Sequence, residues 1–317
     1  MTPKILLTEP IAAAGMELLH AAGEVHVAHA TDPETLAGPL VTADALIVRS
    51  SAVTAGMLKA ARRLKVVGRH GAGVDGIDLA AAERLGIPVV STPGANAESV
   101  AEFVVLAALT LARQAPAAAS SLAGGVFPAG RSLPSAVVAA GLTGTMLAGR
   151  TLGLIGLGAI GRGVAIRAQG LGMTVIGYDV ATTTPPPGVR LVGLEDLLRE
   201  ADVVSLHVPQ TPQTTELIDA AALTRMRPDT LLVNTARAGV VDSAAVLAAL
   251  DAGRLRGYAV DVFAPEPPAP DDPLLHHPRV FATPHMAAMT YDALDAMAVA
   301  VARGVIEHLQ ASEGTEP

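Results

Sequence analysis

The sequence predicts an α/β protein of two lobes, in which parallel strands alternate with helices. Half of the 317 residues are apolar but only 2% are aromatic. The core must therefore consist mainly of Ala, Val, Leu and Ile, which suit parallel strands covered by helices. Short aliphatic runs alternate with Ala-rich stretches of helical pattern, as in βαβ units. The alternation starts anew at Thr151, after a segment rich in Gly, Ala, Ser and Pro.

The expected strands are short aliphatic runs, at residues 4–7, 45–48, 65–68, 151–155, 174–178, 203–207, 231–234 and 258–262. Helical patterns lie between them, at residues 55–61, 79–85, 161–170, 194–200 and 243–252. The last helical stretch, 291–309, has no strand after it and is long enough to return to the first lobe. The apolar stretch 103–112 is interpreted as a buried helix, because a bilayer span needs about 20 apolar residues.

Charge and cysteine content exclude several classes of function. The net charge is −8 and no Lys/Arg-rich run is present, which argues against a nucleic-acid partner. The chain has no cysteine, which excludes disulfides and thiolate metal sites and fits a reducing compartment. Residues 4–7 already read as a strand, so the N-terminus lacks a signal-peptide layout. We therefore expect a cytoplasmic protein with no membrane partner and no metal.

A glycine-rich turn follows the expected strand 151–155. Gly156, Gly158 and Gly161 form the pattern G-x-G-x-x-G, followed by a helical stretch. Gly156 allows the tight turn, Gly158 lets backbone approach a pyrophosphate, and Gly161 lets the helix pack closely on the strand. The helix N-terminus, with Ala159 and Ile160, offers N–H groups to phosphates. The turn therefore predicts a dinucleotide site.

An acidic residue, Asp179, ends the next expected strand. An acid at this place accepts hydrogen bonds from the adenosine ribose and repels a 2′-phosphate. No Arg follows it within the next several residues, so the sequence favours NAD over NADP. The plainer alternative is a glycine-rich turn with a solvent-facing acid.

Three charged or titratable side chains that could bind or react with a substrate, Arg237, Glu266 and His285, come directly after expected strands. The carboxyl ends of parallel strands meet at one edge of a sheet, so we expect all three to face one crevice. A histidine can exchange the proton of a C2 oxygen, and a neighbouring carboxylate fixes its orientation. Arginine can hold a carboxylate through a bidentate fork. Taken singly, the three residues could instead be a structural histidine, a strand-end ion pair and a surface charge.

The chain resembles the D-isomer-specific 2-hydroxyacid dehydrogenases over nearly its whole length. The resemblance rests on motifs at residues 48–50, 68–78, 93–102, 151–161, 205–212, 234–242, 261–267 and 283–285. It implies that Arg237 binds and polarises the substrate, that Glu266 supports His285, and that His285 shuttles the proton. It also implies two Rossmann-like, doubly wound parallel-sheet domains. The cofactor domain, 98–286, would be inserted into a flavodoxin-like substrate domain, 1–97 plus 287–317.

The same resemblance implies further contacts. The NAD cofactor would contact Ala72, Val208, Pro209, Thr211, Thr235, Ala236, Asp261 and Ala287. The substrate would contact Arg49, Arg69, Gly73, Val74 and Asn96. Two arginines would suit a phosphate or sulfonate, although Arg69 could equally face solvent or a carboxylate. A homodimer through the cofactor domain is also implied.

The pattern of Arg49, Arg69 and residues 96–102 is closest to phosphoglycerate dehydrogenase-like members, which implies a phosphorylated or otherwise anionic C3 acid. A hydroxypyruvate or glyoxylate reductase and a sulfolactate-type dehydrogenase stay open. So do a formate or phosphite dehydrogenase and a non-enzymatic, NAD-sensing scaffold like the related corepressors. The chain departs from the family in its long segment 128–147, where Arg131 could reach a neighbouring site, and at Ala287, where glycine is usual. We expect no regulatory domain after the last helix and hence no feedback by serine.

Overall fold

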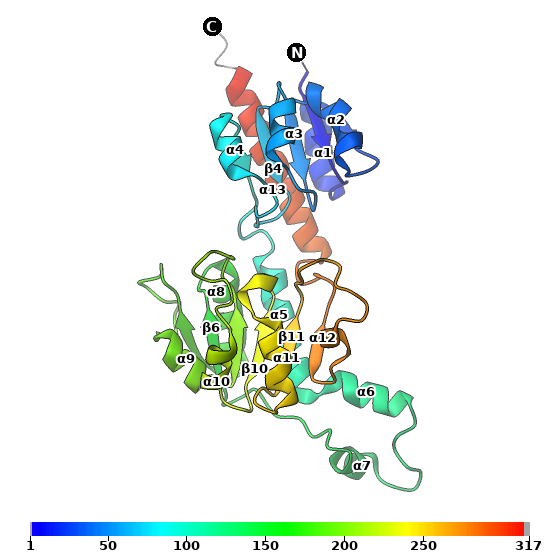
Figure 1. Ribbon diagram of the computed structural model, residues 1–317, viewed down its shortest axis with the longest axis vertical. Coiled ribbons are helices and arrows are strands. Elements are labelled where there is room, and N and C mark those ends of the chain that lie inside the picture. Colours follow the sequence, from blue (N-terminus) through cyan, green and yellow to red (C-terminus); the bar gives the residue numbers. More distant parts are fainter. Residues whose placement is uncertain (1, 314–317) are drawn as a thin grey trace. The chain divides into compact units, whose positions relative to one another are not determined.

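The computed structural model describes residues 2–313, so the outer limits predicted for the first lobe, residues 1 and 317, lie outside the described part. The chain forms two compact units, Met1–Ser99 with Ala288–Pro317, and Val100–Ala287. The sequence placed these divisions after residues 97 and 286. Each unit is built on one sheet of parallel strands, as Figure 1 shows in blue and in green to orange.

The first unit has five parallel strands in the order β2–β1–β3–β4–β5. These are β1 (Lys4–Leu7), β2 (Glu24–Val27), β3 (Ala45–Val48), β4 (Val66–Arg69) and β5 (Val89–Val90). The helices are α1 (Ala13–Ala22), α2 (Pro33–Thr42), α3 (Ala55–Ala60), α4 (Leu79–Arg84) and α13 (Tyr291–Glu313).

Alternate strand residues of the first unit serve two separate cores. Ile5 and Leu7 pack with Leu19 of α1 and Val301 of α13 on one face. Leu6 packs on the other face, with residues of α2, α3 and α4. Strands buried on both faces need no polar alternation, which explains their continuous apolar runs. The last helix therefore does return to the first unit, as its length allowed.

The second unit has seven parallel strands in the order β12–β11–β10–β9–β6–β7–β8. These are β6 (Thr151–Ile155), β7 (Thr174–Tyr178), β8 (Val189–Leu191), β9 (Val203–Leu206), β10 (Leu231–Asn234), β11 (Gly257–Val260) and β12 (Val280–Ala282). The helices among them are α8 (Ala159–Gly170), α9 (Leu194–Glu200), α10 (Ala220–Arg225), α11 (Ser243–Asp251) and α12 (Pro273–His276). The strand order reverses between β6 and β9. This is the topological switch point at which open α/β sheets bind ligands.

Three further helices precede β6, namely α5 (Ala97–Arg113), α6 (Ala115–Ala123) and α7 (Leu133–Ala139). The predicted buried helix is confirmed in α5, where Val104, Ala107 and Ala108 are buried. By contrast, α6 buries none of its residues. In Figure 1, α6 and α7 extend away from the sheet of the second unit. We call residues 115–146 the arm; neither of its helices was predicted from the sequence.

Among residues 2–313, no single helix combines the length and the apolar character that a membrane span requires. The pair α5 and α6, bent by 58°, meets the criterion only when the two helices are joined.

His207 directly follows β9 and lies beneath the glycine-rich turn. Its ring Cδ2 is 3.7 Å from the position that a Cβ would take on Gly161. Both ring nitrogens are buried, and neither has a hydrogen-bond partner among residues 2–313. Burial lowers the pKa of His207 from 6.5 to about 3. The fold therefore holds this ring neutral, and a proton on it opposes folding.

This burial predicts a pH dependence of stability. Between pH 6.5 and about 3 the unfolded chain binds a proton at His207 that the folded chain excludes, so stability falls as the pH falls. The contribution is at most about 1.4 kcal/mol per pH unit. Urea unfolding between pH 7.5 and pH 5 should show a loss of stability that sets in around pH 6.5 in the wild type and is smaller in His207→Leu. An equal loss in the two proteins would contradict the assignment.

Candidate active site

The glycine-rich turn lies at the switch point, between β6 and α8. Gly156 has φ +98°, and a Cβ there would run into the carbonyl oxygen of His207. A Cβ on Gly161 would run into the carbonyl oxygen of Gly156. At Gly158, however, a Cβ would meet no protein atom within 4 Å. The protein itself requires glycine at the first and third positions, whereas the second leaves the room that a pyrophosphate against the backbone would need.

Ala159 and Ile160 begin α8, as predicted, and Gly158 caps the helix without any side-chain hydrogen bond. The N–H groups of the first turn are therefore open to an anion, and the helix dipole favours one.

Asp179 accepts a hydrogen bond from the backbone of the glycine-rich turn, the turn beside which it was predicted to act. Its Oδ2 accepts the N–H of Leu157 at 2.7 Å, and its Oδ1 accepts the N–H groups of Ala181 and Thr182, each at 2.8 Å. Partial burial raises the pKa of Asp179, but these hydrogen bonds outweigh burial and hold the pKa below its usual value. A persistent negative charge thus lies beside the turn, where it would oppose a 2′-phosphate.

The other predicted cofactor residues of the second unit lie in loops that follow β9, β10, β11 and β12. In the loop after β9, Thr211 donates its N–H to Thr214 at 2.8 Å, and Val208 and Pro209 precede them. Thr235 follows β10, and its buried hydroxyl has no partner within the described chain. A buried hydroxyl of this kind suits a polar ligand atom.

Glu266 and His285 meet in the structure. The Nδ1 of His285 lies 2.8 Å from Oε2 of Glu266, while Oε1 of Glu266 accepts the N–H of Phe263 at 2.9 Å. Both side chains are accessible, with 55% of His285 and 40% of Glu266 exposed. If Nδ1 carries the hydrogen in this bond, Nε2 is left to exchange a proton with a ligand.

Hydrogen bonds to the side chain of Asp261 hold the turn that carries His285. His285 has φ +53°, a left-handed conformation that is uncommon outside glycine. Asp261, 1% exposed, accepts the Thr283 hydroxyl at 2.6 Å and the N–H groups of Met286 and Ala287, each at 2.8 Å. Both carboxylate oxygens are therefore engaged with protein donors, so Asp261 shapes the His285 turn besides any contact with the cofactor.

Arg237 follows β10, and a neighbour that was not predicted as a site residue holds its turn. The side chain of Asn234 is fully buried; it donates to the carbonyl of Arg237 and accepts the N–H of Ala236, both at 3.0 Å. Arg237 itself donates through Nη1 to the carbonyl of Ala236 at 2.7 Å. Asn234 could have been recognised from the sequence, because it is the last residue of a buried strand and comes directly before the turn that carries Arg237.

The predicted substrate residues belong to the first unit, and so does Ala72. Within that unit they gather at one edge, because Arg49 follows β3, Arg69 ends β4 and Asn96 comes after β5. The Nη2 of Arg49 contacts Sδ of Met289 at 3.4 Å, and Arg69 donates to the carbonyl of His70. Gly73 and Val74 lie in the loop after β4. This group belongs to the first unit, whereas Arg237, Glu266 and His285 belong to the second, and its role stays a prediction.

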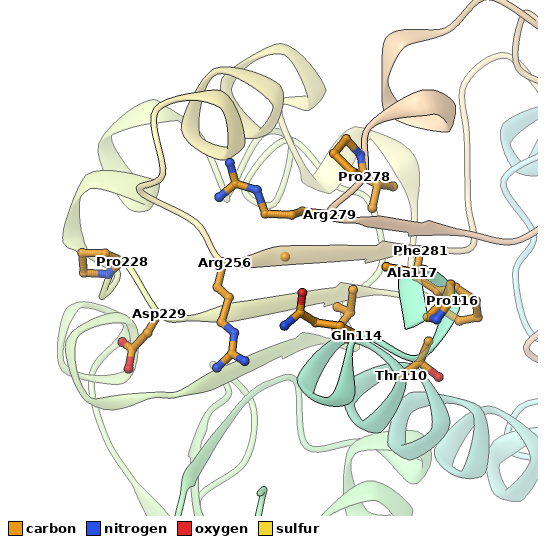
Figure 2. A pocket seen from close by; sticks show the side chains of 13 residues that line it. Thr110, Gln114, Pro116, Ala117, Pro228, Asp229, Arg256, Pro278, Arg279 and Phe281 are labelled. Carbon is orange, nitrogen blue, oxygen red and sulfur yellow. The ribbon is translucent and has the colours of Figure 1, made fainter. Parts of the chain in front are cut away.

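A pocket of about 360 Å³ lies in the second unit, at the edge of the sheet formed by the amino ends of the strands (Figure 2). Asp229, Arg256 and Arg279, which line it, precede β10, β11 or β12 at their amino ends, and Gln114 lines it from the junction of α5 and α6. It is thus separate from the carboxyl edge that carries His285. Within residues 2–313, no group of three or more His, Asp and Glu residues is arranged to hold a metal ion.

Comparison with known proteins supports a single family. Residues 105–287 match the family model described as "D-isomer specific 2-hydroxyacid dehydrogenase, NAD binding domain". The chain is 40% identical, over 307 residues, to D-3-phosphoglycerate dehydrogenase of Methanocaldococcus jannaschii and 39% identical, over 308 residues, to the chloroplastic D-3-phosphoglycerate dehydrogenase 2 of Arabidopsis thaliana. These alignments cover 95% and 96% of this chain but 56% and 48% of the relatives, so the chain spans about half their length.

A solved structure agrees along both chains. The TT0316 protein of Thermus thermophilus superimposes with a TM-score of 0.88 at 35% identity, over 99% of this chain and 98% of the other. The predicted α/β fold of two Rossmann-like domains is therefore confirmed, and residues 105–287 correspond to an NAD-binding domain. The chain belongs to the family of D-isomer specific 2-hydroxyacid dehydrogenases.

Proposed function

We propose that this chain is an NAD-dependent oxidoreductase that interconverts a small 2-hydroxy acid and its 2-oxo acid. The observation that carries the proposal is the hydrogen bond between His285 and Glu266, in the same unit as the glycine-rich turn. Both features lie at the carboxyl edge of one parallel sheet, which is where such sheets bind ligands.

Each of the three catalytic residues has a distinct task. Arg237, always charged, holds the substrate carboxylate and so places C2. Glu266 fixes the imidazole of His285 through Nδ1. His285 then gives a proton to the C2 oxygen in reduction and takes it back in oxidation, through Nε2. The nicotinamide of bound NAD supplies or accepts the hydride.

We infer an anionic C3 acid as the substrate, as in the phosphoglycerate dehydrogenase-like members. Arg49, Arg69, Gly73, Val74 and Asn96 are the candidates that bind it. Support comes from the gathering of these residues at one edge of the first unit, and from the names of the two curated relatives. Two guanidinium groups can bind a phosphate or a sulfonate in addition to the carboxylate.

A panel of 2-oxo acids tests this inference. NADH oxidation with 3-phosphohydroxypyruvate, 3-sulfopyruvate, hydroxypyruvate, glyoxylate and pyruvate gives kcat/KM for each. We expect the phosphorylated acid to be preferred. A preference for hydroxypyruvate or glyoxylate would favour a reductase of the same class, and a preference for 3-sulfopyruvate a sulfolactate-type enzyme. Absence of turnover on all of them would favour the NAD-sensing scaffold.

We propose that the reaction takes place in the cytoplasm, where a pool of NAD is available.

We also propose that the chain forms a homodimer through its arm. Large apolar side chains that are each more than half exposed gather there, namely Leu122, Val126, Leu133, Val138 and Met146. Large exposed apolar side chains concentrated in one segment commonly mark a protein–protein contact. Arg256 fastens the end of the arm through its Nη1, which donates to Thr145 Oγ1 at 3.0 Å.

Removal of the imidazole should affect turnover more than cofactor binding. We expect His285→Ala to lower kcat by at least ~100-fold, the scale for losing a general acid–base, while the Kd for NADH stays close to the wild-type value. Steady-state kinetics and NADH fluorescence titration measure the two quantities. An undiminished kcat would remove His285 from its assigned role.

The charge of Asp179 should set the cofactor preference. We expect Asp179→Ala to narrow the ratio of kcat/KM for NAD over NADP, because the repulsion of a 2′-phosphate is lost. Asp179→Asn removes the charge but keeps one of the two acceptor oxygens, and it should narrow the ratio in the same way. Should the unmodified protein use NADP as well as NAD, this role of Asp179 would be wrong.

Charges on the apolar arm should break the dimer. Light scattering should give twice the chain mass for the wild type and the single-chain mass for the Leu122→Asp, Val126→Asp double variant, because an aspartate is costly to bury in an apolar contact. Val41→Asp, at an exposed valine of α2, is the matched control and should stay dimeric. A monomeric wild type, or a dimeric double variant, would rule out the arm as the dimer contact.

A further inference from the structure

Glu9 is an acidic side chain that the proposed chemistry does not use, yet it lies at the same sheet edge as a predicted substrate residue. Glu9 comes after β1 and Arg49 comes after β3, and the two strands pair in parallel with Leu7 opposite Ile47. Continuing this register sets Glu9 opposite Arg49, at the carboxyl edge of the sheet.

The Glu9 carboxylate binds the loop that carries Arg49. Its Oε2 accepts the backbone N–H of Arg49 at 3.2 Å, and its Oε1 accepts that of Ser50 at 3.3 Å. The hydroxyl of Ser50 donates to Oε1, and the hydroxyl of Ser51 reaches Oε2 at 3.5 Å. The Thr8 hydroxyl donates to Oε2 at 2.5 Å. A carboxylate can accept this many bonds because it has two acceptor oxygens and no donor.

Among residues 2–313, the guanidinium of Arg49 has a single, weak side-chain contact. Its Nη2 lies 3.4 Å from the thioether sulfur of Met289, and a thioether is a weak acceptor. The direction of the side chain therefore depends mainly on the backbone from which it extends. Binding a ligand costs less entropy when the receiving loop is already ordered.

We propose that Glu9 is a positioning residue that holds residues 49–51 so that Arg49 is preorganised for an anionic substrate. The inference rests on the proposed function, because it requires Arg49 to bind the 2-oxo acid. Glu9 does not touch the substrate. Its two oxygens face the N–H and O–H groups of its own loop and of residues 49–51.

Glu9→Gln tests this role with little change in size. An amide has one donor end, which would face at least one of the N–H groups of Arg49 and Ser50 instead of accepting from it. We expect the KM for the preferred 2-oxo acid to rise about tenfold, the scale for losing hydrogen bonds to a charged group. The kcat should change by less than about twofold, and the Kd for NADH should stay the same, because Arg49 affects substrate binding alone.

Two further variants distinguish a positioning role of Glu9 from a general loss of stability. Asp44 lies in the same unit but at the amino end of β3, where it accepts the N–H of Lys4 at 2.9 Å and Nη2 of Arg63 at 3.0 Å. Asp44→Asn should lower Tm and leave KM unchanged. Ser50→Ala removes one donor to Glu9 and should raise KM by a smaller factor than Glu9→Gln. Equal KM rises in Asp44→Asn and Glu9→Gln would overturn the proposal, and so would an unchanged KM in both Glu9→Gln and Ser50→Ala.

Arg49→Ala separates this inference from the proposed function. We expect it to raise KM, and we expect the Arg49→Ala, Glu9→Gln double variant to show no further rise, because Glu9 acts through Arg49. If KM rises in Arg49→Ala but not in Glu9→Gln, the inference about Glu9 is wrong and the proposed function stands. A double variant whose KM rises by the product of the single effects also overturns it. Absence of turnover on every 2-oxo acid in the wild type overturns the proposed function and the inference together.

Discussion

Hydrogen bonds from backbone N–H groups to buried or half-buried side-chain oxygens hold the loops on which the proposed chemistry depends. Parallel strands end their hydrogen-bond ladders at the carboxyl edge, so the loops beyond have no sheet partner. In this chain side chains replace that partner. Asp179 holds the glycine-rich turn, Asp261 the turn of His285, Asn234 the turn of Arg237, and Glu9 the loop of Arg49.

The four side chains differ in chemistry according to what each must hold. Asp261 accepts three donors while only 1% exposed, which a carboxylate can do because each oxygen takes more than one bond. Asn234 must both donate and accept, to Arg237 and from Ala236, so an amide is suited there. Glu266 differs from all of these, because it holds the imidazole of His285 besides the N–H of Phe263 and stays 40% exposed.

The sequence predicted the sheets well because both periodicity and glycine patterns are local signals. Residues 4–7, 45–48 and 151–155 are strands with the predicted bounds. Three strands and both arm helices were not predicted. The strand β2 alternates polar and apolar residues and has no aliphatic run, and β5 and β8 are too short to carry a period. The arm, rich in Ala, Gly and Ser, fits a loop as well as the helices α6 and α7. The nearness of Glu266 to His285 was expected from strand ends. The bonds of Glu9 to residues 49–50 were not, because they join residues forty positions apart through a register that only the folded sheet defines.

Glu9 and Asp179 hold their loops as charged carboxylates, so the geometry of these loops does not depend on proton transfer. Burial raises the pKa of Glu9, but hydrogen bonds from Ser50, Thr8 and the amide of Arg49 outweigh it, and the net shift is downward. Asp179 shifts the same way. A folded-state pKa below the unfolded value stabilises the fold above the unfolded pKa, and this stabilisation is lost as the pH falls through the folded pKa. Both carboxylates thus keep their charge and their donors well into the acidic range. Neither carboxylate therefore has to exchange a proton during the reaction proposed for His285, and these two loops stay in place.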